Sequence, residues 1–222
     1  MNNLEYVKEK LKNSFDVKYR PVQTVLGRAT VVFIDDLCNA EMISEYVVSP
    51  LRGTGELEPK NGKIETIEQL IENSLDINAA GIAKDLDDAI MHILSGDPAV
   101  IFEGFEQILY VEAKGFPVRG VGTPETESVL KGPREGFNEL IVNNVALIRR
   151  RIKNPDLKFE AVVVGEKSQT AVAVCYLEGV APKDLVENVK EKVNNLDLRF
   201  ILDTNYVEDA LKNQKSFFDT VG

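Results

Sequence analysis

The stretch that decides the fold is "KGPREGFNELIVNNVALIRRRI", which runs from Lys131 to Ile152. Gly132 and Pro133 are typical of a helix entry, because proline suits the first turn. Apolar residues at helical spacing then predict one buried stripe: Phe137, Ile141, Val145, Ile148 and Ile152. Arg134 falls in the predicted first turn, where a cation opposes the helix dipole by about 0.3–1 kcal/mol. We therefore expect a specific partner to hold Arg134.

Two hypotheses describe that partner. In the structural one, the Arg134 guanidinium binds a carboxylate such as Glu125 or Glu127, or the carbonyls of the Gly- and Pro-rich stretch that follows Lys114, and locks two halves of the protein together. In the functional one, Arg134 faces a cleft between the halves and binds an anionic group of a ligand near the helix N-terminus. Glu135, next in sequence, suits the positive end of the helix dipole and belongs to the same candidate site.

The helix is predicted to end with Arg149, Arg150 and Arg151, where the dipole favours cations. Successive helical residues are about 100° apart, so the three side chains span about 200° and cannot all face one patch. At least one of them is expected to contact a carboxylate of the second half or a partner subunit. Asn144 lies beside the apolar stripe and completes the set of ligand-binding or interface candidates.

Strands are predicted on both sides of this stretch. "ATVVFID" is continuously apolar, which is typical of a strand buried on both faces. "PAVIFEG" and "QILYVEA" predict a hairpin, and "LKFEAVVV" and "TAVAVCYL" predict two more strands around a turn at Glu166–Gln169. A further short strand is expected at residues 199–202.

Helices are predicted between these strands from apolar residues at helical spacing. The helix at residues 36–51 should be capped by Asp35 or Asp36. The helix at residues 181–196 should bury the stripe Leu185, Val189, Val193 and Leu196. The other helices are expected at residues 4–15, 64–75, 83–97 and 204–214.

The Gly- and Pro-rich stretch at residues 114–133 separates two groups of strands and helices. We interpret it as a connector between two small mixed α/β subdomains. The predicted division is an N-terminal subdomain at residues 1–113, the connector at 114–133, and a C-terminal subdomain at 134–222 that contains the long signature helix.

The composition is that of a soluble globular protein, with 222 residues, 44% hydrophobic and 28% charged. A net charge of −10 argues against binding nucleic acid or anionic lipid through the overall field. No run approaches the roughly 20 apolar residues of a membrane helix, and the N-terminus lacks the apolar core of a signal peptide. Cys38 and Cys175 lie in apolar stretches and are expected to be buried free thiols in a reducing compartment.

The sequence carries no recognisable catalytic motif. His92 is the single histidine and lies inside a predicted helix, without a nucleophile and carboxylate that could be assigned to it. Histidine and cysteine do not occur at zinc-ligand spacing, and neither a dinucleotide-binding nor a P-loop motif is present. We therefore predict no enzyme, no catalytic residue, no metal and no cofactor.

One segment carries a resemblance to a known family. "TPETESVLKGPREGFNELIVNNVALIRRRI" resembles the signature segment of the A subunit of spore germinant receptors, which has a Pro-x-Thr-Glu element, Gly-Pro-Arg-Glu-Gly-Phe and an Asn-x-x-Leu-Ile-Arg-Arg-Arg-Ile ending. The similarity continues through "VVVGEKSQTAVAVCYLEGVA" and "LRFILDTNYVEDAL". The first half resembles the family only in pattern, and Lys131 stands where the family more often has arginine.

The resemblance implies a role without covalent chemistry. Such A subunits work with B and C subunits in the spore inner membrane, where the receptor senses nutrients and triggers germination. They continue into several membrane-spanning helices that this sequence does not reach, so we expect a soluble N-terminal region on the cytoplasmic, core-facing side that assembles or couples the receptor. The alternative is a small-molecule module that binds a germinant between the two subdomains. Self-association stays open.

Overall fold

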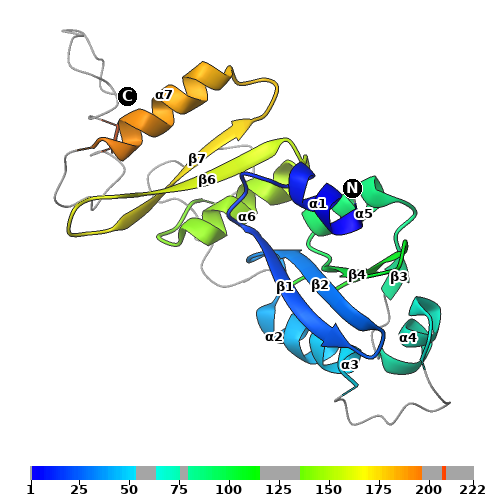
Figure 1. Cartoon of the computed structure of the whole chain (residues 1–222). Coiled ribbons are helices and arrows are strands. Elements are labelled where there is room, and N and C mark those ends of the chain that lie inside the picture. The colour runs from blue at the N-terminus through cyan, green and yellow to red at the C-terminus, as the bar shows by residue number, and fades with distance from the viewer. Residues whose placement is uncertain (1, 54–63, 76–79, 116–135, 197–206, 209–222) are drawn as a thin grey trace, which may run out of the picture. The chain divides into compact units, whose positions relative to one another are not determined.

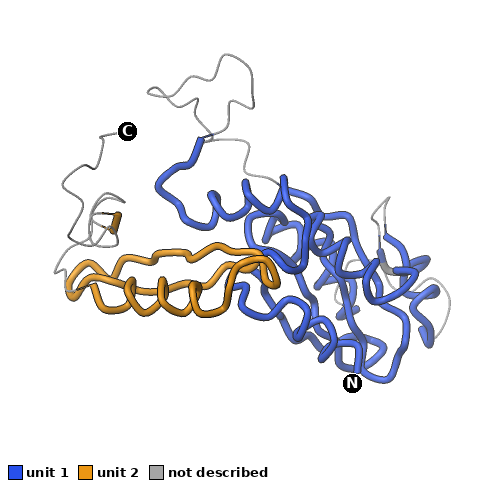
Figure 2. The backbone as a smooth tube through the Cα atoms, turned by 90° about the horizontal axis from the view of Figure 1, so that it is seen from above, with its two compact units in different colours: residues 1–157 blue, residues 158–222 orange. Residues whose placement is uncertain are grey.

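The computed structural model describes residues 2–53, 64–75, 80–115, 136–196 and 207–208. The chain divides into two compact units, unit 1 at residues 1–157 and unit 2 at residues 158–222, which Figure 2 shows in separate colours. Strands and helices occur in both units, so the predicted mixed α/β class is confirmed. The division falls after Leu157, however, and differs from the expected one at residues 114–133. Of that predicted connector, the structure describes only Lys114 and Gly115.

Unit 1 is built on a five-stranded antiparallel sheet in the order β1-β2-β4-β5-β3 (Figure 1). The β1–β2 hairpin pairs Val17 with Ile34, and β4 and β5 form the hairpin predicted from the sequence. β1 and β3 were not predicted, because β1 is polar along much of its length and β3 has three residues. The strands are β1 (Val17–Thr24), β2 (Gly27–Ile34), β3 (Ala80–Ile82), β4 (Ala99–Phe102) and β5 (Ile108–Val111).

Helices cover both faces of this sheet (Figure 1). Val32 of β2 packs in a cluster with α1, α5 and α6, whereas its neighbour Val31 packs in a second cluster with η1, α3 and α4. This confirms the prediction that "ATVVFID" is buried on both faces. The helices are α1 (Asn3–Lys10), α2 (Ala40–Met42), the π-helical segment η1 (Ile43–Val48), α3 (Ser49–Leu51), α4 (Ile67–Ser74), α5 (Leu86–Leu94) and α6 (Ile141–Arg151).

The cap expected at Asp35 or Asp36 is wrong. The side chain of Asn39 caps α2 instead and accepts hydrogen bonds from the amides of Glu41 and Met42 at 2.9 and 3.1 Å. Asp36 has a φ of 61°, a left-handed conformation that aspartate tolerates better than most residues and that turns the chain after β2. The two carboxylates before the apolar run therefore lie in a turn and do not cap a helix. The helix begins at Ala40, four residues after Asp36.

Unit 2 contains β6 (Leu157–Val164), whose first residue belongs to unit 1, β7 (Thr170–Leu177) and α7 (Lys183–Asn194). The two strands pair, and α7 packs on them through Val193 with Val162 and Val164. The predicted α7 stripe is wrong at Leu185, which is 55% exposed, whereas Val186 is buried. The expected strand at residues 199–202 lies outside the described residues, as does the expected helix at 204–214 except for residues 207 and 208.

Candidate functional site

The signature helix begins later than its sequence predicts. α6 starts at Ile141, and residues 136–140 before it are not helical. The Asn144 side chain forms two hydrogen bonds with the backbone of this non-helical stretch. Its Oδ1 accepts from the Asn138 amide and its Nδ2 donates to the Asn138 carbonyl, both at 2.8 Å. The Asn138 side chain in turn accepts from the Leu140 amide at 2.8 Å. Asparagine side chains that bond the local backbone compete with helix formation, and apolar spacing does not reveal that competition.

The later start changes the argument about Arg134. Because α6 begins at Ile141, the dipole penalty assigned to Arg134 in the first turn of this helix is wrong. Arg134 itself lies outside the described residues, as do Glu125, Glu127 and Glu135. Both hypotheses for the partner of Arg134 therefore stay predictions.

The buried face of α6 also differs from the expected stripe. Phe137 and Ile152, at the two ends of that stripe, are 69% and 41% exposed. Of the three closing arginines, Arg150 and Arg151 are exposed, whereas Arg149 is fully buried. The prediction that the three cannot share one patch is thus confirmed. The residues of α6 that are buried are Val145, Ala146, Leu147 and Arg149.

Arg149 forms a buried ion pair with Asp16, which precedes β1. Its Nε donates to Asp16 Oδ2 at 2.8 Å and its Nη2 to Asp16 Oδ1 at 3.2 Å, which is the forked geometry that a guanidinium makes with a carboxylate. Nη1 donates to the Leu157 carbonyl at 2.7 Å, and Nη2 also lies 3.1 Å from Ser14 Oγ. The two charged side chains are 0% and 1% exposed. Asp16 belongs to the first half of the sequence, so the expectation that at least one of the three arginines contacts a carboxylate of the second half or a partner subunit stays a prediction.

The surroundings of this pair are poorly solvated. Burial, with a smaller contribution from the negative charge of Asp16, raises the pKa of Tyr19 to about 12. Tyr19 is thus a neutral phenol at physiological pH beside a carboxylate that needs its own counter-charge. Sequence reasoning could not single out Asp16, because "NSFDV" is an ordinary helix-to-strand turn and nothing local links it to Arg149.

A second polar cluster surrounds His92, which the sequence did not connect to any partner. His92 Nδ1 lies 3.2 Å from Asp97 Oδ2, and Lys114 Nζ lies 3.2 Å from the other oxygen of the same carboxylate. The imidazole stacks on Tyr110 with ring centroids 3.6 Å apart. The Asp97 side chain is 3% exposed, and Lys114, the first residue of the predicted connector, supplies a counter-charge to this buried carboxylate. We interpret the cluster as structural.

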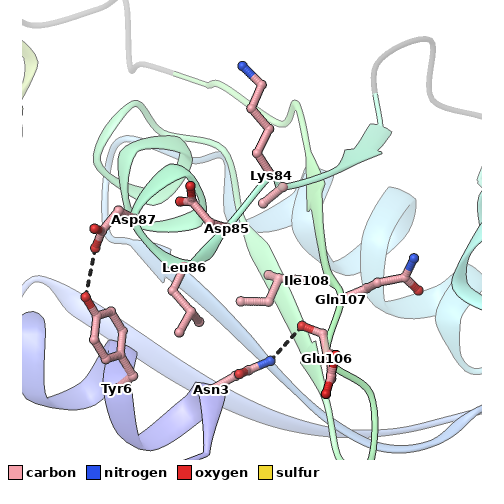
Figure 3. A pocket seen from close by; sticks show the side chains of 10 residues that line it. Asn3, Tyr6, Lys84, Asp85, Leu86, Asp87, Glu106, Gln107 and Ile108 are labelled. Carbon is pink, nitrogen blue, oxygen red and sulfur yellow. Dashed lines mark hydrogen bonds between the residues drawn. The ribbon is translucent and has the colours of Figure 1, made fainter.

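Unit 1 also has a pocket of about 750 Å³ between α1 and the segments that lead into α5 and β5 (Figure 3). Tyr6 Oη donates to Asp87 Oδ1 at 2.9 Å and Asn3 Nδ2 to the Glu106 carbonyl at 2.8 Å. Its size is within the range of small-molecule sites. The pocket is lined by Asn3, Tyr6, Ala83, Lys84, Asp85, Leu86, Asp87, Glu106, Gln107 and Ile108.

Two carboxylates of this pocket, Asp85 and Asp87, have partners within unit 1. Asp85 caps α5 by accepting from the Asp88 amide at 2.8 Å, and the hydrogen bond from Tyr6 engages Asp87. That bond is the largest cause that raises the pKa of Tyr6 above its ordinary value. Within the described part of the chain, no group of three or more His, Cys, Asp or Glu residues is arranged to hold a metal ion. By its volume, the pocket is a candidate for a small organic ligand.

The signature segment and the fold can be compared with known proteins. The family described as GerA, Bacillus/Clostridium GerA spore germination protein, matches residues 5–222. The chain belongs to this family. The resemblance to spore germinant receptor A subunits that the signature segment indicated is thereby confirmed.

Two curated relatives come from Bacillus subtilis (strain 168). Stage V sporulation protein AF is 31% identical over 215 residues, which are 96% of this chain and 43% of that protein. Spore germination protein KA is 25% identical over 217 residues, which are 96% of this chain and 39% of that protein. The chain thus spans less than half the length of these relatives.

A solved structure shares the fold. The N-terminal domain of the A subunit of the Bacillus megaterium spore germinant receptor GerK3 matches with a TM-score of 0.65 and 24% identity, covering 97% of this chain and 79% of that one. Among the residues that the structure describes here, no helix has both the length and the apolar character needed to cross a bilayer.

Proposed function

We propose that this GerA-family chain is the N-terminal region of a nutrient germinant receptor A subunit, and that it assembles the receptor and couples nutrient sensing to germination. The proposed partners are B and C subunits, and the proposed location is the cytoplasmic, core-facing side of the spore inner membrane. The observation that carries this proposal is the family match over residues 5–222, which includes the whole signature segment. The fold shared with an N-terminal domain supports the position within the subunit.

The structure adds a physical reason for a coupling role. The signature segment leads into α6, and α6 is anchored in unit 1 by the buried Arg149–Asp16 pair. A force applied to the signature segment would therefore reach the sheet of unit 1 through a bonded path. Packed elements and ion pairs of this kind can transmit a two-state change.

The test removes this region from the A subunit in spores that also carry a second, intact receptor for another nutrient. We expect loss of germination on the cognate nutrient, retention of germination through the second receptor, and loss of B and C subunits from the detergent-solubilised A subunit. The Arg52→Ala variant changes an exposed arginine outside the candidate interface residues, so it is the point-mutant control and should behave like the parent. Normal germination without the region would refute a role in assembly or coupling.

The second candidate function is a small-molecule binding module. The expected ligand site between the two subdomains stays a prediction, whereas the pocket of unit 1 is a specific observation in favour of binding. Calorimetry of the purified chain against amino acids and sugars tests it. The diagnostic variant is Leu86→Arg, whose larger side chain fills the pocket. If this variant no longer binds the ligand, the ligand occupies the pocket; if binding is retained, the ligand binds elsewhere. If none of the amino acids or sugars binds, assembly and coupling alone are favoured.

A further inference from the structure

The pocket of unit 1 has an apolar floor, formed by Ala83, Leu86 and Ile108. Ala83 and Ile108 are buried and belong to the hydrophobic cluster that α1 and α5 share with the sheet. Leu86 packs against the same cluster and is partly buried. The floor is therefore a continuation of the core that stays open to the pocket, and a ligand with an apolar part gains by covering it.

The rim of the pocket carries three carboxylates, Asp85, Asp87 and Glu106, and one ammonium, Lys84, all of them on exposed residues. Asp85 and Asp87 come from the start of α5, whereas Glu106 comes from the segment before β5. Figure 3 shows the Lys84 side chain directed away from the floor. Among the residues that the structure describes, neither Lys84 nor Glu106 forms an ion pair through its side chain. The rim is therefore negative, and its own cation does not neutralise it.

The neutral hydrogen-bond donors of the rim are already engaged. Tyr6 Oη donates to Asp87 Oδ1 at 2.9 Å. Asn3 Nδ2 donates to the Glu106 carbonyl at 2.8 Å, and Gln107 Nε2 donates to a carboxylate outside the pocket at 2.7 Å. A ligand therefore meets chiefly carboxylate oxygens, which accept hydrogen bonds and cannot donate them. Such a ligand must bring the donors itself.

An anionic ligand is disfavoured at this rim. α5 begins at the pocket, and a helix N-terminus favours negative charge. That favourable position is already occupied by the chain's own carboxylates, because Asp85 caps α5 and Asp87 lies in its first turn. A further anion would be repelled by them and by the net charge of −10, whereas a cation would form charge-assisted hydrogen bonds with them.

We propose that the pocket of unit 1 binds a small organic cation, an amine with a short apolar chain. The rim carboxylates bind its ammonium group, and its apolar chain lies on Leu86 and Ile108. The ammonium group supplies the donors that the rim lacks, and the pocket volume of about 750 Å³ is within the range of small-molecule sites. This inference rests on the second candidate function, small-molecule binding at this pocket, and names the class of ligand.

The test is a titration of the isotope-labelled 222-residue chain, followed by amide NMR. The probes are butylammonium, pentanoate and 1-butanol, which share a butyl chain and differ in charge. The salt concentration is about 0.15 M, so that charges more than about 8 Å from the probe are largely screened. We expect butylammonium to shift the amide signals of Ala83, Leu86 and Ile108, and pentanoate to leave them unchanged. 1-Butanol should bind more weakly than butylammonium.

A matched pair of variants locates the charge that selects the ligand. Glu106→Gln removes one rim carboxylate and keeps the shape of the side chain. Glu103→Gln changes an exposed carboxylate of the same β4–β5 connection that does not line the pocket. We expect Glu106→Gln to weaken butylammonium binding about twofold to fivefold, as for loss of an exposed ion pair, and Glu103→Gln to bind like the parent.

Three outcomes would overturn the proposal. If 1-butanol or pentanoate binds the pocket as tightly as butylammonium, the pocket binds small molecules but does not select a cation, so only the ligand class is wrong. If Glu106→Gln and Glu103→Gln weaken butylammonium binding equally, the probe binds the acidic surface in general. If no probe shifts the pocket signals, the pocket does not bind such amines, and the titration with amino acids and sugars decides separately whether it binds another small molecule.

Discussion

Truncation of Arg149 should destabilise unit 1 far more than truncation of its neighbour Arg150. Arg149→Ala leaves the Asp16 carboxylate, which is 1% exposed, without its counter-charge. Removal of one partner of a buried ion pair costs about 3–5 kcal/mol, mostly because the other charge stays buried and uncompensated. The Leu157 carbonyl also loses the donor at 2.7 Å, but this loss belongs to the same network and is not an independent addition.

The expected loss is large compared with the stability of a typical domain, which is about 5–15 kcal/mol. Arg150 is exposed, so we expect Arg150→Ala to lower the free energy of unfolding by about 1 kcal/mol or less. The Asp16→Asn/Arg149→Met double variant should be more stable than Arg149→Ala, because no charge is left unpaired. The three variants together distinguish the cost of the orphaned carboxylate from the loss of side-chain packing.

The assay is urea unfolding followed by alkylation of Cys38, a buried thiol of unit 1 that becomes accessible when the unit unfolds. Far-UV circular dichroism on the same samples reports the whole chain. If Arg149→Ala and Arg150→Ala unfold within about 1 kcal/mol of each other, the buried pair does not carry the stability assigned to it. A double variant as unstable as Arg149→Ala would instead show that the cost lies in packing.

Two further predictions follow from titrating groups. Burial alone would raise the pKa of Glu160, but hydrogen bonds from Lys190 and Tyr176 outweigh it and lower that pKa below its usual value. The ionised Glu160 therefore stabilises the fold fully above the unfolded pKa of about 4.3, and this contribution is lost as the pH falls through the lower folded pKa. In Glu160→Gln, the melting temperature followed by circular dichroism should fall less steeply with decreasing pH than in the parent. The same pH dependence in both proteins would contradict the prediction. Burial raises the pKa of Cys38 to about 12, whereas Cys175 is exposed, so thiol titration at about pH 8 should find one reactive thiol in the folded chain and two in urea. Two rapidly reacting thiols in the folded chain would contradict the burial of Cys38.

The elements that sequence predicted correctly are those with a strong local pattern. Within "ATVVFID" the residues 31–34 are all apolar, and the structure buries Val31 and Val32 on opposite faces of the sheet. The residues Ile90, Ile93 and Leu94 recur at helical spacing and are buried in α5, as expected. The signature segment identified the family without any structural information. Hydrophobic periodicity and the order of motifs depend only on residues that are close together in the sequence, so both can be recognised without a structure.

What failed in the sequence reading depended on contacts that periodicity does not encode. Apolar spacing predicted a helix from Pro133, but the side chain of Asn144 bonds the backbone at Asn138 and α6 begins only at Ile141. Residues 199–202 and most of the connector lie outside the described residues, so the predictions there remain untested.

The sequence by itself determined the mixed α/β class, the main strands and helices, and the family. The tertiary structure alone decided which of three adjacent arginines is buried, where the chain divides into units, and that Arg149 binds the Leu157 carbonyl. "RRR" offers three equivalent cations at the end of a helix, and the choice of Arg149 comes from a carboxylate 133 residues away. A buried charge is stable only where the fold brings its partner to it, and that proximity is a property of the packed chain.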